Sequence, residues 1–182
     1  EGEGAATGLE LVGAFALTDL EPDIVTFASR DSISTEDRLA ALRALRDLRS
    51  TEVDLFVNLA TSETEDAAIR ETALTALGAS PVPEAATQLL ELYPDLDLTQ
   101  RRNALTDLSS SKSGARALVA AIESESIAAT DLDITVTERL TAVLEGEPEL
   151  NTLIDSLGHV FGEILLFNGN DAATAGARAV SY

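Results

Sequence analysis

The chain has 182 residues, and 32 acidic against 12 basic residues give it a formal charge of −20 at pH 7. This balance argues against nucleic acid and anionic membranes as partners, because both are bound through clustered Lys and Arg. The absence of Cys excludes disulfides and thiolate chemistry, and a single histidine, His159, excludes a multi-histidine metal site. Hydrophobic residues make up 45% of the chain and aromatic residues 4%, which predicts a folded protein whose core consists of small and aliphatic side chains.

The expected elements recur along the chain as pairs of helices. The first helix of a pair ends in two leucines three residues apart, just before a turn that contains Ser or Gly. These leucines recur about 30 residues apart, and equal steps reach Leu17 near the start and Leu140 near the end, so five units are expected. The leucine pairs are Leu45/Leu48, Leu74/Leu77 and Leu105/Leu108.

A second apolar stretch with helical spacing follows each turn, which makes each unit a predicted helical hairpin. Ser34, Thr64, Thr99 and Ser113 are the expected helix caps. Three aromatic residues of successive helices, Phe15, Phe27 and Phe56, are expected in the core. The second stretches are Ile24–Phe27, Leu55–Leu59, Ala86–Leu90, Leu118–Ile122 and Leu150–Leu157.

A nearly fixed period with the turn always in the same phase predicts an all-α fold, a HEAT-like α-solenoid of about five helical hairpins over residues 1–162. An ordinary helical bundle is the alternative.

No window reaches about 18 uninterrupted apolar residues, so no membrane insertion is expected. Residues 163–182 are expected to form a C-terminal tail or cap, or the start of a following domain.

Catalytic motifs are absent from the sequence, since it has neither a Gly-x-Ser-x-Gly turn nor a phosphate-binding glycine loop. His159 lies in an apolar stretch and is expected to be packed or at the surface; a Ser–His–Asp arrangement from distant residues stays open. No catalytic, cofactor-binding or metal-binding residue is predicted. Three groups of residues could supply oxygen ligands for calcium: Asp95/Asp97, Asp131/Asp133 and Asn168/Asn170/Asp171. None of them matches the twelve-residue calcium-binding loop, so we expect these residues at turns and helix starts.

The stretch from about Leu39 to Phe161 resembles the helical-repeat region of large secreted bacterial proteins that carry a dehydrogenase-like propeller and a C-terminal c-type haem domain. The likeness lies in the order of apolar anchors from Leu118–Glu123 to Phe161-Gly162, and in Asp171–Tyr182, which looks like the first haem-domain helix. Because the chain has no Cys, no haem ligand is carried over. The resemblance implies an extracytoplasmic location, periplasmic or secreted.

The sequence therefore predicts a non-catalytic helical-repeat scaffold for protein–protein interaction, which positions modules within a larger extracytoplasmic assembly, including a redox, haem-containing one. The alternative is a self-assembling structural protein whose ends stack into filaments, and an enzyme is the third reading. The expected partner is a protein or a second copy of the chain, and no cofactor is expected. The sequence leaves open whether the negative charge is a solvated face or a surface that attracts a basic partner.

Overall fold

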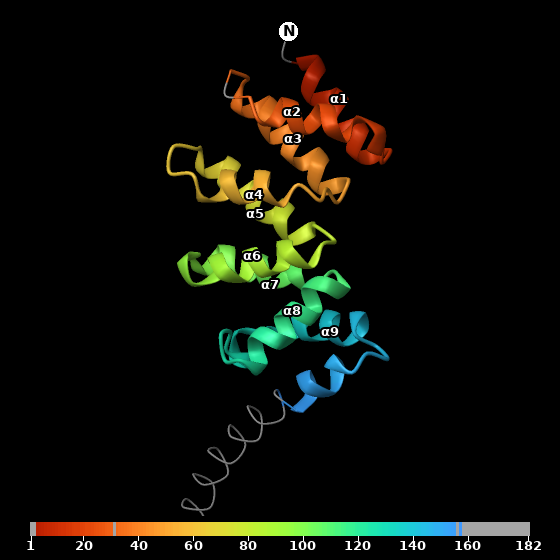
Figure 1. Cartoon of the computed structure of the whole chain (residues 1–182), viewed down its shortest axis with the longest axis vertical. Coiled ribbons are helices and arrows are strands. Elements are labelled where there is room, and N and C mark those ends of the chain that lie inside the picture. Colours follow the sequence, from red (N-terminus) through yellow and green to blue (C-terminus); the bar gives the residue numbers. More distant parts are fainter. Residues whose placement is uncertain (1–2, 31, 156, 158–182) are drawn as a thin grey trace, which may run out of the picture.

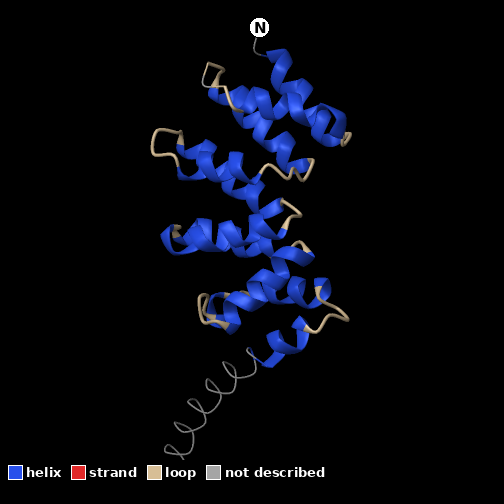
Figure 2. Ribbon diagram, viewed as in Figure 1, coloured by secondary structure: helices blue, strands red, loops and turns tan. Residues whose placement is uncertain are grey.

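The computed structural model of the chain describes residues 3–30, 32–155 and 157. Throughout this described part the chain forms helices and connections with no strand, which confirms the predicted all-α class (Figure 2). His159 and residues 163–182, including the acidic turn Asn168–Asp171, lie outside the described residues. The α-helices are α1 (Glu3–Ala14), α2 (Glu21–Ala28), α3 (Thr35–Asp47), α4 (Val53–Thr61), α5 (Ala67–Ala79), α6 (Pro83–Leu92), α7 (Leu98–Leu108), α8 (Lys112–Glu123) and α9 (Ile134–Val143).

Three 3₁₀ turns and a further helical stretch at residues 149–155 complete the described part. The 3₁₀ turns are Thr18–Leu20, Tyr93–Asp95 and Ala129–Asp131. Two of them lie in the connections that precede α7 and α9, and the third leads directly into α2.

The helices follow one another along the long axis of the molecule (Figure 1). The first helices of the pairs, α1, α3, α5, α7 and α9, each pack against the next, while α4 packs on α6 and α6 on α8. The turns after α3, α5 and α7 lie along one side, on the right in Figure 1, and the connections that precede α3, α5, α7 and α9 lie along the other. We call these two sides the turn edge (residues 48–52, 80–82 and 109–111) and the loop edge.

The starts of α3, α7, α8 and α9 carry side-chain caps, although not always at the predicted residue, and Asp66 stands at the N-cap of α5 without a cap hydrogen bond. Ser34 caps α3 as expected, because its hydroxyl accepts the Asp37 N–H at 3.1 Å. The predictions for three other caps were wrong. Asp97 caps α7 through a reciprocal pair of hydrogen bonds with Gln100, which satisfies more backbone groups than a single hydroxyl does. The residues predicted in error are Thr64, Thr99 and Ser113, and the observed N-caps are Asp66, Asp97 and Ser111.

The core lies between the first and second helices and is continuous along the molecule. The leucines that end the first helices are its main component: Leu45, Leu77, Leu108 and Leu140 are fully enclosed, as is Phe56. Small residues occupy the places where the first helices meet, and this allows their backbones to approach closely. The buried alanines of these helices are Ala40, Ala41, Ala44, Ala73, Ala76 and Ala104.

The first helix pair departs from the predicted pattern. Phe15, predicted in the core, is 71% exposed, and Leu17, predicted as the equivalent of the buried leucines, is 45% exposed. The buried residue here is Val12. Both mispredicted residues follow the end of α1, where Ala16 adopts φ 50° and the chain leaves the helix. Whereas α1 packs on α3, the stretch beyond its end leads into the 3₁₀ turn Thr18–Leu20, which packs against α2.

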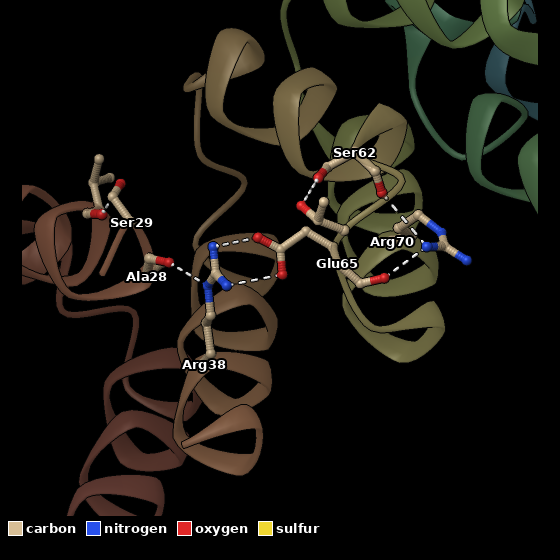
Figure 3. Close-up of polar contacts among 8 residues, drawn as sticks. Ala28, Ser29, Arg38, Ser62, Glu65 and Arg70 are labelled. Carbon is tan, nitrogen blue, oxygen red and sulfur yellow. Dashed lines mark hydrogen bonds and ion pairs between the residues drawn. The ribbon is translucent and has the colours of Figure 1, made fainter. Parts of the chain in front are cut away.

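A buried ion pair fastens the loop edge (Figure 3). The Arg38 guanidinium donates from Nε to the Ala28 carbonyl and from Nη1 to Glu65 Oε2, both at 2.8 Å, and its Nη2 lies 2.8 Å from Glu65 Oε1. Arg70 donates to the Glu65 carbonyl at 2.6 Å. The side chains of Arg38 and Glu65 are 9% and 15% exposed, so the fork joins the end of α2, the start of α3 and the connection before α5 in a largely dry site.

Gly114→Ala is expected to destabilise the fold, because an added Cβ would lie 2.3 Å from the Leu108 carbonyl oxygen, a backbone atom that cannot move independently. The free energy of unfolding should fall by about 1–3 kcal/mol, as for an overpacked core site. Gly8→Ala is the matched control, since nothing lies within 4 Å of its Cβ position in α1. It should raise stability by up to about 1 kcal/mol. Urea denaturation followed by circular dichroism measures both, and equal effects would contradict the close approach at Gly114.

Candidate functional site

A groove of about 860 Å³ runs along the turn edge. We call it the turn-edge groove. Its volume falls within the range of about 300–1,000 Å³ that is usual for binding sites. Four successive helix pairs contribute to it, and the lining residues are Arg49, Pro81, Pro83, Thr87, Ser110, Ser111, Lys112, Ser113, Arg116, Ala117 and Val143.

The sequence builds the groove from tight connections between first and second helices. Arg49 ends α3 with φ 56°, and the next N–H, that of Ser50, bonds back to the Leu45 carbonyl at 2.9 Å. This left-handed helix end reverses the chain within a few residues. Pro83 then starts α6, where its missing N–H has no partner to lose. Gly114 lets the first turn of α8 lie directly against the end of α7.

Hydrogen bonds between neighbouring turns hold the walls of the groove together. The Ser80 hydroxyl donates to the Ser50 carbonyl at 2.8 Å, and both serines are almost fully buried. The Ser113 hydroxyl donates to the Pro81 carbonyl at 3.0 Å. Each bond joins one turn to the next, so the serines that the sequence marks as turn residues also fix the spacing of the turns. The groove is therefore a shared product of several helix pairs.

The groove is cationic on a strongly acidic chain. Its eleven described lining residues include Arg49, Lys112 and Arg116 and no Asp or Glu, whereas the whole chain has 32 acidic and 12 basic residues. The N-terminal ends of α6 and α8 also open here, and helix N-termini add a partial positive charge. This combination suits a ligand that carries negative charge.

Two carboxylates that are not part of the lining, Glu147 and Glu149, pair with two of these cations at one corner of the groove. Lys112 Nζ lies 2.8 Å from Glu147 Oε1, and Arg116 Nη2 lies 2.6 Å from Glu147 Oε2. Arg116 Nε also lies 3.2 Å from Glu149 Oε1. Hydrogen bonds from Lys112 and then Arg116 lower the pKa of the Glu147 carboxyl, which shows that the corner favours an ionised carboxylate.

A second, apolar groove of about 430 Å³ lies between α1 and α2, lined by residues such as Leu9, Val12 and Phe27. Its neighbourhood is unusually apolar. Four of the seven large hydrophobic residues that are exposed within the described part of the chain lie between positions 11 and 20: Leu11, Phe15, Leu17 and Leu20. We call these four exposed side chains the N-terminal apolar patch.

A smaller hollow of about 230 Å³ lies at the loop edge beneath Tyr93 and Arg101. The Arg101 guanidinium carbon lies 5.4 Å from the centroid of the Tyr93 ring, and Arg101 Nη2 donates to the Pro94 carbonyl at 2.6 Å. Burial, followed by the charge of Asp131, raises the pKa of Tyr93. These contacts fasten the end of α6 to the start of α7 and have a structural role.

Asp107 is a partly buried carboxyl in the packed part of the described chain. It lies where α5 meets α7, and a Cβ added at Gly78 would be 2.6 Å from the Asp107 Cβ. Burial raises the pKa of Asp107 to about 6, although the charges of Arg46 and Arg139 oppose the shift. The sequence gives no sign of this shift, because an Asp near the end of a helix is ordinarily solvated.

The Asp-Leu-Asp pairs lie at turns and helix starts, as expected. Asp97 and Asp133 are the N-caps of α7 and α9, and Asp95 and Asp131 lie in 3₁₀ turns. Across residues 3–30, 32–155 and 157, no group of three or more His, Asp or Glu side chains could hold a metal ion. No helix in the same ranges has both the length and the hydropathy needed to cross a membrane.

Asp107→Asn is expected to stabilise the protein above neutral pH, because it removes a partly buried charge. Since the folded-state pKa is raised, the stability of the natural chain falls as pH rises from about 4 to about 6. At about pH 7.5 the variant should gain about 1–2 kcal/mol after allowance for partial exposure, and less at about pH 5. Asp155→Asn, at an exposed position, is the control. Urea denaturation at the two pH values measures the difference; a gain independent of pH would contradict the assignment.

Comparison with known proteins gives no relative: no family model, no curated protein and no solved structure matches the chain. The resemblance to the repeat region of secreted haem-domain proteins therefore stays a prediction. A proposal of function therefore has to be argued from the geometry and charge of the turn-edge groove and of the N-terminal apolar patch.

Proposed function

We propose that the chain is a non-catalytic protein-interaction scaffold, a HEAT-like α-solenoid of about five helical hairpins that binds a partner protein in the turn-edge groove. The observation that carries this proposal is the groove itself, which turns of successive helix pairs build together and which their hydrogen bonds keep in register. Repeat proteins of this type expose extended surfaces made of equivalent elements, and they bind other proteins there.

The helix contacts support the solenoid reading. Second helices pack on the first helix of the following pair: α2 lies against α3, and α4 lies against α5. A pair therefore does not bury its apolar stripe alone but shares it with its neighbour, which is the behaviour of stacked repeats. In an ordinary bundle the helices would instead surround one common centre.

The lining of the groove supports binding of a protein segment. Thr87 and Ser110 are exposed hydroxyls, Pro81 and Ala117 give short apolar contacts, and the cations provide charge. Hydroxyls and cationic side chains form hydrogen bonds with the backbone and the side chains of a bound protein segment. For the place of action we propose a position outside the cytoplasm, between modules of a larger assembly; the resemblance described above supports this part.

Self-assembly is the second candidate, and the N-terminal apolar patch favours it. Phe15 is 71% and Leu11 is 50% exposed, next to the apolar groove between α1 and α2. Another apolar helix surface would bury these side chains, and head-to-tail contacts of this kind build filaments. The patch lies at one end of the described stack of helices, where such contacts extend the stack (Figure 1).

A photocrosslinking amino acid at Thr87 tests the scaffold proposal in cells that produce the chain. Thr87 is exposed in the groove, and Thr99, exposed at the loop edge, is the matched control. We expect a discrete crosslinked partner from position 87 and none from position 99, because only the first position lies in the proposed binding surface. The same products from both positions, or none from position 87, would overturn the scaffold proposal.

Phe15→Ser tests self-assembly. If the N-terminal apolar patch holds copies together, analytical ultracentrifugation should show association that strengthens with protein concentration and is lost in the variant. Ile134→Ser is the control, because Ile134 is 76% exposed but lies far from the patch, in α9. A natural chain that stays monomeric at about 100 µM, well above the dissociation constants of stable dimers, would rule out this candidate.

A further inference from the structure

One corner of the turn-edge groove already binds carboxylates, and these come from the chain itself. Glu147 has both oxygens engaged, one by Lys112 at 2.8 Å and the other by Arg116 at 2.6 Å, and Glu149 shares Arg116. We infer that the turn-edge groove binds an acidic, extended segment of a partner protein, whose carboxylates replace Glu147 and Glu149 on Lys112 and Arg116. This inference rests on the proposed scaffold function and names the chemistry of the partner.

The charge of the chain makes the groove selective for such a segment. An acidic segment is repelled by most of a surface whose formal charge is −20. In the groove it meets Arg49, Lys112 and Arg116, of which Lys112 and Arg116 are paired with Glu147 and Glu149 until those carboxylates are displaced. At physiological salt, charges more than about 8 Å away are largely screened, so the three cations dominate the local field once the two internal carboxylates have left. The acidic surface then disfavours other binding positions and the groove accepts the segment.

The shape of the groove fits an extended chain. Helices packed side by side lie about 8–10 Å apart, so three successive turns span about 20 Å, or about six extended residues. Two hydroxyls lie exposed along this path and donate to carbonyls of their own helices, Thr87 to Pro83 and Ser110 to Asp107. Their lone pairs remain able to accept N–H groups of a bound backbone. The cations then select the acidic side chains.

The two internal carboxylates are held in a way that permits exchange. Gly146, beside Glu147, has φ 80°, and nothing lies within 4 Å of its Cβ position, so the connection after α9 has space around it. Oε2 of Glu149 is buried and has no hydrogen-bond partner among the described residues. Release of Glu149 to water satisfies this atom, while carboxylates of the partner keep Lys112 and Arg116 paired. The exchange therefore preserves the ion pairs and removes one poorly satisfied group.

A labelled peptide with the sequence of residues 145–149, Glu-Gly-Glu-Pro-Glu, repeated to about ten residues, tests the inference with the full chain. Fluorescence anisotropy compares it with the same peptide carrying Gln for Glu. We expect the Glu peptide to bind about tenfold more tightly and to weaken when NaCl rises from about 50 to about 300 mM. Arg116→Gln and Lys112→Gln should each weaken binding about tenfold, whereas Glu147→Gln should strengthen it several-fold, because it removes the internal competitor.

Arg43→Gln is the matched control, since it removes one exposed positive charge from α3 outside the groove. Circular dichroism and melting temperature establish that each variant is folded. Equal affinity for the two peptides, no binding of either, or equal losses in Arg43→Gln and Arg116→Gln would overturn the inference. Unchanged affinity in Glu147→Gln would overturn the exchange. A partner crosslinked at Thr87 without any preference for the Glu peptide would overturn the acidic class alone and leave the scaffold in place.

Discussion

The close approach of successive first helices is the constraint on which the rest of the structure depends. Small residues and glycines set the spacing: a Cβ at Gly78 would lie 2.6 Å from the Asp107 Cβ, and one at Gly13 would lie 3.2 Å from the Asp47 Cβ. Because the helices meet at this short distance, their C-terminal ends align and the turns that follow lie side by side. The turn edge and its groove are thus a consequence of backbone packing at Gly and Ala positions.

The two edges of the molecule use charge in opposite ways. At the loop edge, Arg38 and Glu65 are nearly buried and paired through a fork, so truncation of either would leave an uncompensated charge in a dry site. At the turn edge, Lys112 and Arg116 are about half exposed, and their pairs with Glu147 are of the kind that exchanges with solvent and ligands. The loop edge therefore stabilises the fold, and the turn edge is the side at which we propose that ion-pair partners exchange.

The sequence was sufficient to predict the all-α class and most of the buried leucines, because these follow from local spacing and turn residues. It failed at Phe15 and Leu17, which fit the period but lie beyond the end of α1, where the chain has left the helix. The groove was missed because its lining comes from residues as far apart as Arg49 and Val143. One signal was available, since Lys112 and Arg116 are four residues apart on one helix face in a chain with few cations.

Charge also separates the two proposed activities. Glu10 and Asp19 lie in the same stretch of sequence as the N-terminal apolar patch, and Asp23 lines the apolar groove together with Leu20, so copies that meet there repel one another until salt screens them. The attraction between an acidic segment and Arg49, Lys112 and Arg116 in the turn-edge groove changes with salt in the opposite direction. Low ionic strength therefore favours capture of an acidic partner by a single chain, and high ionic strength favours association of chains through their apolar ends. The same charge distribution thus makes proposed binding in the turn-edge groove weaken, and proposed association through the N-terminal apolar patch strengthen, as ionic strength rises.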